Sequence, residues 1–481
     1  MDRAKGRRRS FARERGSMKH WMFYPALWAG KLFLWRYRQE GRLQNDRPGM
    51  VSMRLCGDFL RDVAKPNLTV AVSGTNGKTT ISSMLASVLT ADGRSVSYND
   101  WGANHHAGHA RCLLDAVDIW NRPTKDVAVI EMDELISPLN VPAIRPEYLI
   151  LNNLGRDSML RNANPQFIQG RLAKAAAGSP ETTVVVNGDD PLCCFLGEGN
   201  RRIRFGVGDL HLDPLPNIAP DCTVCPVCGA PIRFRYRQYR QVGDFFCGKC
   251  GMTRPEPEYF VEQVDYDRGT LTMREPRGTY TYPLISPSVF NLYDEAAAIT
   301  LLRDLGITPE VLAQELKQAA IPASRRSRET VAGVELITQM TKGQNPAAAS
   351  TVFERIAKDP APKELVLLLD EVYTDPHKSE TAAWMFDTDY EDLNRPEIRK
   401  IIVGGARYLD HKVRLLLAGV PREKIVCIRD PFETPRYVDT QGVQEIFVLH
   451  DVVFISRGRQ VRDKIAEKLR AEREEGAVYG D

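Results

Sequence analysis

The order of apolar runs and amphipathic stretches predicts a parallel sheet in the first part of the chain. Short runs rich in Val, Ile and Leu, each ending in Gly, Asn or Asp, are typical of buried strands. Four such runs occupy residues 67–74, 126–134, 147–155 and 182–190. The first precedes "KTTISSMLASVLTADG", whose spacing is helical and which stops at Gly93. Because the other intervals also leave room for crossover helices, we expect a doubly wound α/β domain.

The C-terminal third repeats this alternation and predicts a second, smaller α/β domain. Its expected strands are "ELVLLLDE", "IRKIIVGG" and "KIVCIRD", which begin at residues 364, 398 and 424. The segment 460–476 is predicted to be a charged helix with a solvated face.

Domain boundaries are predicted where this alternation of apolar strands and amphipathic helices is interrupted. A helix predicted over 291–306 leads to a boundary within "IPASRRSRET", residues 321–330. The expected parts are an N-terminal arm over 1–50, a central domain over 51–320 and a C-terminal domain over 321–481.

The arm is basic at its start and then aromatic. Its apolar stretch "WMFYPALWAGKLFLW" has 15 residues and contains Lys31, whereas a spanning helix needs about 20 apolar residues. One interpretation is a helix packed on the next domain. The alternative is a helix on a membrane surface, because basic residues flank the aromatic ones.

Composition describes a soluble globular protein of two or three domains. The chain has 481 residues, of which 43% are hydrophobic and 26% charged, with a formal net charge of +3. That charge is too small to argue for nucleic acid by itself. Ten cysteines without a secretory leader predict thiols or metal ligands in a reducing cytosol, and hence a cytoplasmic protein.

"GTNGKTT", residues 74–80, predicts a phosphate-binding loop between the first strand and its helix. The standard loop begins two residues earlier with a glycine, where this chain has Val72. Two glycines still allow the turn that points N–H groups at a phosphate. Lys78 is predicted to reach the terminal phosphates, and the Thr79 hydroxyl to join a Mg²⁺ shell. The predicted nucleotide-binding residues are Gly74, Thr75, Asn76, Gly77, Lys78, Thr79 and Thr80.

A magnesium ion at this loop requires a carboxylate in addition to the hydroxyl. Glu131 directly follows the strand "DVAVI", and a neighbouring parallel strand would bring it to the same edge of the sheet. We expect Glu131 to be the ligand, with Asp133 and Glu134 as close alternatives.

Four cysteines predict a metal site in residues 219–256, a segment that differs from its surroundings by its cysteines and its alternating basic and aromatic residues. They form two C-x-x-C knuckles, each followed by a glycine, and are Cys225, Cys228, Cys247 and Cys250. This spacing is typical of a structural zinc ribbon, in which thiolates fill every position around the ion. Cys222 is the alternative to Cys225.

The ribbon's "RFRYRQYR" allows two interpretations. Alternating Arg and aromatic residues bind single-stranded nucleic acid in some proteins, which would suit a nucleic-acid-dependent NTPase. In a β-strand, the same alternation only separates rings from guanidinium groups. We expect the second, and no nucleic-acid partner.

The loop "GTNGKTT" resembles the ATP loop of the Mur ligase superfamily, and further stretches resemble its MurT family. They are "ALWAGK" at 26–31, "NDWGANHHAG" at 99–108, "NLGRD" at 153–157, "VNGDDP" at 186–191, "FNLYDEAAA" at 290–298, "WMFDTDYE" at 384–391 and "GGARYLDHKVRLLLAG" at 404–419. The resemblance implies a Mur-type central ATPase domain that carries the zinc ribbon, and a C-terminal Mur-ligase domain. It also implies that ATP is held between them, with Asn291 at the adenine.

The implied reaction is ATP-dependent amidation of the D-glutamate of lipid II, in peptidoglycan synthesis. The substrate carboxylate would become an acyl phosphate, assisted by Lys78 and Mg²⁺, before ammonia displaces the phosphate. Two alternatives stay open: amidation of a related glutamyl carboxylate, and a non-catalytic ATP-binding scaffold for an amidotransferase.

The ammonia source is expected to be a separate protein, because the chain contains no G-x-C-x-G nucleophile motif. The resemblance implies a class I glutamine amidotransferase subunit of the GatD type, in a heterodimer. In the family, an acidic residue of the C-terminal domain completes that partner's Cys–His pair. Here the family pattern Y-A-D-G-R-D-x-S-W is replaced by the longer "YTDPHKSETAAW", which leaves Asp375 as the first candidate and Glu380 as the second.

Two other family stretches leave roles open. "NLGRDSMLRNA" keeps Asn153, Arg156, Asp157 and Arg161 but replaces neighbouring polar family residues, which leaves more than one acceptor substrate open. Arg407 and Asp410 match a family motif, for which a buried structural ion pair is one interpretation.

Overall fold

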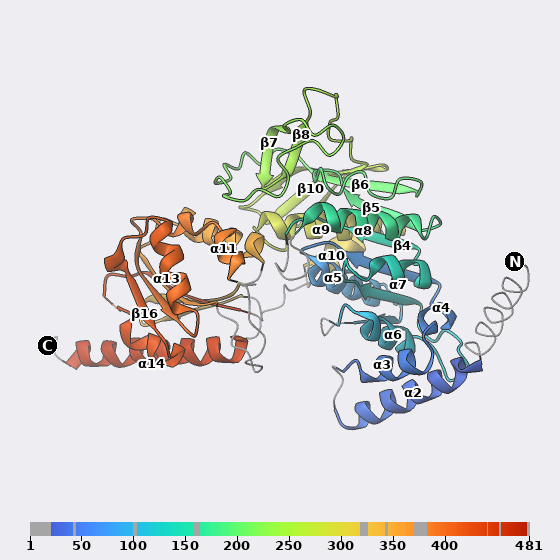
Figure 1. Ribbon diagram of the computed structural model, residues 1–481, viewed down its shortest axis with the longest axis horizontal. Helices are drawn as coiled ribbons and strands as arrows, with labels where there is room; N and C mark the ends of the chain where they lie inside the picture. The colour runs from blue at the N-terminus through green and yellow to red at the C-terminus, as the bar shows by residue number, and fades with distance from the viewer. Residues whose placement is uncertain are drawn as a thin grey trace, which may run out of the picture. The chain divides into compact units, whose positions relative to one another are not determined.

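The computed structural model consists of two compact units. It describes residues 21–41, 45–99, 103–156, 164–317, 326–341, 345–369, 382–439, 441–451 and 454–478. The N-terminal unit comprises residues 1–154, 165–213 and 222–320, and the C-terminal unit comprises 155–164, 214–221 and 321–481. Figure 1 shows the sheet and helices of each unit. No helix among the described residues is long and apolar enough to cross a bilayer.

The N-terminal unit is built on a nine-stranded sheet with the order β11-β10-β9-β6-β5-β4-β1-β3-β2. The strands are β1 (Leu68–Ser73), β2 (Val96–Tyr98), β3 (Val127–Glu131), β4 (Tyr148–Leu151), β5 (Thr183–Asn187), β6 (Arg202–Val207), β9 (Tyr259–Asp265), β10 (Thr270–Glu275) and β11 (Gly278–Pro283). Pairing is parallel from β2 to β9, whereas β10 and β11 extend the sheet antiparallel. The four strands predicted from sequence in this part are confirmed as β1, β3, β4 and β5.

Helices cover both faces of this sheet. One face carries α5 (Lys78–Ala91), α9 (Val289–Asp304) and α10 (Pro309–Leu316). The other carries α2 (Phe23–Gln39), α3 (Arg47–Leu55), α4 (Phe59–Asp62), α6 (His106–Asp115), α7 (Ser137–Ile144) and α8 (Pro165–Ala177). Successive side chains of β1 alternate between the two cores: Val70 and Val72 pack with α5, and Ala71 packs on the opposite side. Burial on both faces explains why the strand is apolar at nearly every position.

A small hairpin of β7 (Arg233–Tyr239) and β8 (Val242–Phe246) is inserted between β6 and β9. Along β7, exposed arginines alternate with half-buried rings, as the strand interpretation of "RFRYRQYR" predicts. The hairpin is attached to the unit through Asp189, whose carboxylate accepts from Arg254 Nη1 at 3.1 Å and whose carbonyl accepts from Gly243 N at 2.9 Å. A tilted ring contact adds to this attachment, since the ring centroids of Tyr239 and Phe290 lie 4.1 Å apart.

The C-terminal unit has a six-stranded sheet with the order β12-β13-β17-β14-β15-β16. Its strands are β12 (Arg326–Val331), β13 (Val334–Met340), β14 (Lys363–Leu368), β15 (Ile398–Gly404), β16 (Ile425–Ile428) and β17 (Glu445–His450). All pairs are parallel except β12 with β13. The predicted strands of this domain are confirmed as β14, β15 and β16.

Helices also line both faces of the second sheet. They are α11 (Pro346–Lys358), α12 (Ala383–Phe386), α13 (Tyr408–Leu417) and α14 (Ile455–Val478), with short 3₁₀ turns at Tyr390–Leu393, Arg422–Lys424 and Pro431–Tyr437. The charged helix predicted over 460–476 lies within α14. Only one of its faces is solvated, because Val461, Ile465 and Leu469 pack into the core.

Candidate nucleotide and metal sites

The loop between β1 and α5 has the backbone that a phosphate cradle requires. Gly74 and Gly77 have φ angles of +128° and +88°, in the region that favours glycine. A Cβ at Gly77 would lie 2.0 Å from Asp294 Oδ1, so a side chain is also excluded by space. The helix begins at Lys78, and the first N–H groups of α5 therefore open toward the loop.

Two asparagines at the end of β4 hold this loop. Thr75 N donates to Asn153 O at 2.9 Å, and Asn76 N donates to Asn153 Oδ1 at 3.0 Å. Asn152 Nδ2 donates to Asp294 Oδ1 at 2.6 Å, which ties the same edge to α9. Asn152 and Asp294 were missed by sequence reasoning. For Asn152 the available signal was the asparagine pair directly after a buried strand, at the edge where parallel strands end. Asp294 lies within α9, where no such local signal exists.

Lys78 is folded back over the loop in a buried position. Its Nζ lies 2.7 Å from Glu134 Oε1 and 2.5 Å from Gly74 O. The side chain of Glu134 is 1% exposed, so this ion pair is shielded from solvent. A phosphate placed over the loop would compete with Glu134 for the ammonium group. The structure thereby assigns Glu134 to Lys78 as its ion-pair partner. From the sequence alone, Glu134 was an equally acceptable candidate for a metal ligand.

Glu131 is positioned at the same edge by a set of buried polar groups. Its Cα is paired with that of Val72 in the register of β1 and β3. Asn99 clamps its backbone by accepting from Glu131 N at 2.8 Å and donating to Glu131 O at 3.0 Å. His109 Nε2 donates to the same carbonyl at 3.0 Å, and burial lowers the pKa of His109 to about 3, so the ring is neutral.

The Glu131 carboxylate fits the expected cation ligand. Its Oε2 is buried and has no hydrogen-bond partner among the described residues. Such an oxygen is costly to bury unless an ion or water meets it. Asp133 is engaged elsewhere, since its Oδ1 accepts from Leu135 N at 2.9 Å. Thr79 lies at the second position of α5 and is half-buried.

Asn291, expected at the adenine, lies in the first turn of α9. Its Nδ2 donates to Ser286 Oγ at 2.9 Å. Asp294 follows one turn later, and residues three apart in a helix share a face. The helix that meets the phosphate loop through Asp294 therefore carries Asn291 on the same side.

Four cysteine thiols converge at the open end of the inserted hairpin, before β7 begins and after β8 ends. The Sγ atoms of Cys225, Cys228, Cys247 and Cys250 all lie within 4.8 Å of one another. The knuckles repeat one backbone pattern: Gly229 N donates to Cys225 O at 2.9 Å and Gly251 N donates to Cys247 O at 3.1 Å. Both glycines have positive φ. The cluster is compatible with the predicted four-thiolate zinc ribbon.

Cys222 is not part of the four-cysteine cluster. Its Sγ lies 3.4 Å from Val224 O, and the residue is buried with the apolar core. At the cluster itself, backbone N–H groups of Cys250 and Lys249 lower the pKa of the Cys247 thiol. The thiolate is the form that binds a metal.

In the C-terminal unit, the structure places some of the candidate residues and not others. Asp375 and Glu380 lie outside the described residues. Arg407 and Asp410 form an ion pair at 3.4 Å with side chains 32% and 45% exposed, so the interpretation as a buried pair is wrong. Arg156 Nη1 pairs with Asp387 Oδ2 at 2.8 Å, which joins two of the family-like stretches.

Comparisons with known proteins agree with this arrangement. The family described as "Mur ligase middle domain" matches residues 72–209, and "MurT ligase C-terminal" matches residues 343–451. The lipid II isoglutaminyl synthase (glutamine-hydrolyzing) subunit MurT of Streptococcus pneumoniae (strain ATCC BAA-255 / R6) is 27% identical over 407 residues, covering 84% of this chain and 88% of that protein. The protein of the same name from Staphylococcus aureus (strain COL) is 27% identical over 432 residues, covering 88% and 94%.

A solved structure supports the fold independently. The pseudomurein peptide ligase type C from Methanothermus fervidus superimposes with a TM-score of 0.63 at 18% identity, covering 85% of this chain and 81% of that one. The two α/β units, the phosphate loop with its lysine, and the family matches to residues 72–209 and 343–451 therefore agree. The chain belongs to the Mur ligase superfamily of ATP-dependent carbon–nitrogen ligases, as a member of its MurT type.

Proposed function

We propose that this chain amidates the D-glutamate α-carboxylate of lipid II to D-isoglutamine at the expense of ATP. The observation that carries the proposal is the phosphate loop that follows β1, with Lys78 folded over it and Glu131 at the end of the neighbouring strand β3. Sequence similarity over most of the chain to the two MurT subunits, which are named for a lipid II isoglutaminyl synthase, supports lipid II as the substrate. A related glutamyl carboxylate is the alternative acceptor.

In the proposed reaction, a carboxylate oxygen attacks the γ-phosphorus of ATP and ADP leaves, which forms an acyl phosphate. Ammonia then attacks the acyl carbon, phosphate leaves, and a proton is lost from nitrogen. Lys78 and the loop N–H groups of residues 74–80 would hold the transferred phosphoryl group and offset its charge. Thr79 and Glu131 would hold Mg²⁺, which supplies further charge neutralisation at the phosphates. Asn291 would contact the adenine.

The second proposed metal is structural. We assign Zn²⁺ to the four-cysteine cluster, where thiolates occupy all positions and leave none for substrate. The fit rests on the convergence of four thiols and on the two matching knuckles.

Ammonia would come from a partner, which we propose to be a class I glutamine amidotransferase of the GatD type. The words "glutamine-hydrolyzing" and "subunit" in the names of the MurT relatives support a glutaminase partner. Asp375, with Glu380 as the alternative, is proposed to complete the partner's catalytic group. Because lipid II is a membrane lipid, we also propose that the chain works in the cytoplasm at the inner membrane face.

The test is phosphate release from Mg-ATP with ammonium present, with and without lipid II, while the lipid is followed by mass spectrometry. We expect lipid-dependent release and a product lighter by one mass unit, as replacement of OH by NH₂ requires. The Lys78→Ala variant should lose at least ~100-fold in rate, since an electrostatic contact to the transferred group is gone. Lys174→Ala, on the exposed side of α8, is the control. Turnover without lipid dependence would direct the search to other glutamyl carboxylates, whereas no turnover with a glutaminase added would favour the ATP-binding scaffold.

Glu131→Gln tests the magnesium assignment. Loss of the carboxylate charge should raise the Mg²⁺ concentration needed for half-maximal ATP turnover by ~10-fold or more, because Mg²⁺ depends on carboxylate ligands. The amide keeps the backbone clamp by Asn99, so the thermal midpoint should stay close to that of the native chain. Asp133→Asn serves as the matched control. Equal Mg²⁺ dependence in Glu131→Gln and the native chain would refute the assignment.

A further inference from the structure

Helix α2 has two apolar faces, of which only one is covered. The covered face packs on the neighbouring helices through Phe23, Ala26, Leu27 and Leu34. The solvent face would ordinarily be polar. Here the helix, together with Trp21 just before it, presents large apolar side chains that are spaced three or four residues apart and all exposed: Trp21, Tyr24, Trp28, Leu32 and Trp35. The interpretation as a helix packed on the domain is confirmed for the covered face, and the membrane-surface interpretation stays a prediction for the exposed one.

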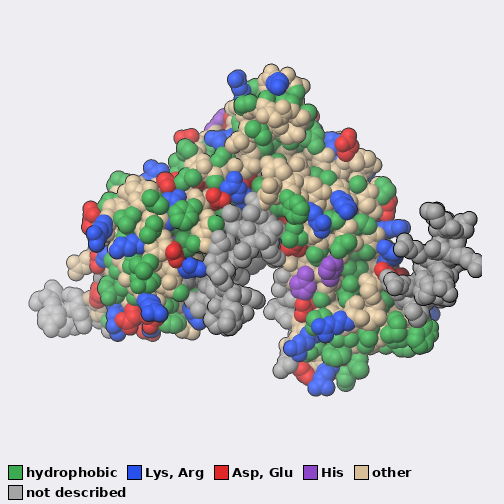
Figure 2. All heavy atoms as spheres, in the orientation of Figure 1, with side chains coloured by type: hydrophobic (Ala, Val, Ile, Leu, Met, Phe, Trp, Pro, Cys, Tyr) green, Lys and Arg blue, Asp and Glu red, His purple; other side chains and the backbone are tan. Residues whose placement is uncertain are grey.

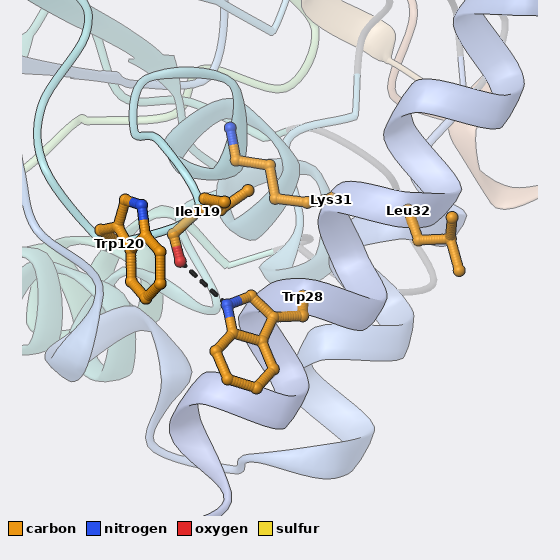
Figure 3. A pocket seen from close by; sticks show the side chains of 5 residues that line it. All are labelled: Trp28, Lys31, Leu32, Ile119 and Trp120. Carbon is orange, nitrogen blue, oxygen red and sulfur yellow. Dashed lines mark hydrogen bonds between the residues drawn. The ribbon is translucent and has the colours of Figure 1, made fainter.

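The turn between α6 and β3 extends this row of exposed side chains. Ile119 and Trp120 are 51% and 59% exposed. Trp28 Nε1 donates to Ile119 O at 2.9 Å, and Lys31 Nζ donates to Val117 O, so the turn is fastened to α2. Figure 3 shows Trp28 and Trp120 on either side of Ile119. Together with Lys31 and Leu32, these residues line an open groove of ≈ 410 Å³. We call Trp21, Tyr24, Trp28, Leu32, Trp35, Ile119 and Trp120 the aromatic face.

The net charge of the N-terminal segment favours an anionic partner for the aromatic face. Residues 1–41 contain eleven Lys and Arg against three Asp and Glu, a net charge of +8. The remaining residues contain 54 basic and 59 acidic side chains, a net charge of −5. The positive charge of the chain is therefore concentrated in and before α2. Figure 2 shows hydrophobic side chains over the region of α2, with Lys and Arg side chains close by.

The acidic groups beside the aromatic face are already engaged. Asp115 pairs with Arg38, and Asp118 Oδ1 accepts from the backbone N–H groups of Trp120 and Arg122 at 2.8 Å each. Both carboxylates are thereby held by contacts within the protein itself. Trp and Tyr are also the side chains that favour the boundary between lipid headgroups and acyl chains.

We infer that the aromatic face lies on an anionic lipid bilayer, with α2 parallel to the membrane plane. Apolar side chains would enter the headgroup boundary while the basic residues contact anionic lipid, the combination that gives peripheral helices stable binding. The inference deepens the proposed function, because a lipid-linked substrate would then be met by a chain already at its surface. Its basis is nevertheless α2 itself and not the ligase chemistry.

The test is flotation of the full chain with vesicles that contain no lipid II. One set is phosphatidylcholine alone, and the other contains about one third phosphatidylglycerol. We expect flotation with the anionic vesicles, weakened in high salt, together with a blue shift of tryptophan emission. Four of the six tryptophans belong to the aromatic face, so the shift reports on it directly.

Leu32→Ser/Trp35→Ser should reduce flotation ~10-fold or more, because two exposed apolar contacts are lost. The matched control is Leu409→Ser/Leu417→Ser, which removes two similarly exposed side chains from α13. Equal flotation of the two double variants, or no flotation of the native chain, overturns the inference. So does a dimer in solution that the first double variant abolishes, since a second copy would then cover the face.

Failure of this inference is separable from failure of the proposed function. Both double variants should amidate detergent-solubilised lipid II at the native rate. A native chain that floats but does not amidate would leave the membrane surface intact and refute the ligase proposal. A native chain that amidates lipid II but does not float would support the ligase proposal and refute the membrane inference.

Discussion

At the residue scale, buried charge decides the character of the phosphate loop. Lys78 and Glu134 neutralise each other in a position that solvent barely reaches. Glu131, three residues before Glu134, keeps one oxygen without a partner among the described residues. Sequence placed these acids near the loop but could not rank them, because their roles depend on which cation each side chain meets.

Glu295 provides a pH test at this scale. The residue is buried in α9, its Oε2 accepts from Ile285 N at 3.1 Å, and burial raises its pKa to about 8. The unfolded chain releases this proton near 4.5. The contribution of the protonated Glu295 carboxyl to the free energy of unfolding is therefore fully present below pH 4.5 and is lost as the pH rises to about 8.

Glu295→Gln cannot ionise, so its stability relative to the native chain should increase between pH 5 and pH 9. The increase should amount to several kcal/mol, at about 1.4 kcal/mol per pKa unit. Urea unfolding midpoints at pH 5, 7 and 9 measure it. Glu310→Gln is the control, because the pKa of that exposed carboxyl is lowered and both states are ionised above pH 5. Parallel pH profiles for Glu295→Gln and the native chain would refute the role of burial.

At the scale of elements, apolar periodicity was sufficient where a strand is buried on both faces. It predicted β1, β3, β4 and β5, and helix α9 to within two residues at each end. The antiparallel strands β9, β10 and β11 were not predicted, since their half-exposed alternation is a weaker signal. Strand β17, which was also missed, has a fully buried run from which it could have been predicted.

The junction of β1 and α5 allows a test at this scale. Gly77→Ala would add a left-handed strain of about 1 kcal/mol and a collision with the side chain of Asp294. Gly93, at the other end of α5, has a similar φ of +84° with nothing within 4 Å of the added carbon. Gly93→Ala should therefore cost about 1 kcal/mol, and Gly77→Ala at least about 2 kcal/mol. Urea unfolding compares them, and equal costs would show that space at Gly77 is not limiting.

At the scale of the whole molecule, the candidate site is assembled from segments distant in the chain. Residues 74–78, 131–134, 152–153 and 291–294 meet only because β3 and β4 flank β1 and α9 packs on α5. The inserted hairpin depends on the same unit, since Asp189 and the ring of Phe290 hold it.

Zinc content tests this larger organisation. We expect one zinc per chain by metal analysis, lost in Cys228→Ser and kept in Cys222→Ser, because only the former thiol is in the cluster. Loss of the ion should increase hydrogen exchange in residues 219–256 and at the contacts of Asp189. Exchange in β14, in the other unit, should be unchanged. Loss of zinc from Cys222→Ser, or retention by Cys228→Ser, would contradict the assigned ligands.

The sequence by itself determined the chemistry that the chain carries. Glycines and a lysine at a strand–helix junction specify a phosphate loop, and two C-x-x-C knuckles specify four thiols, because these signals are local and depend on short spacings. Only the tertiary structure decided which acid faces Lys78, which cysteine stands apart, and which face of α2 remains uncovered. Those outcomes depend on long-range packing, where residues far apart in the chain compete for the same contacts.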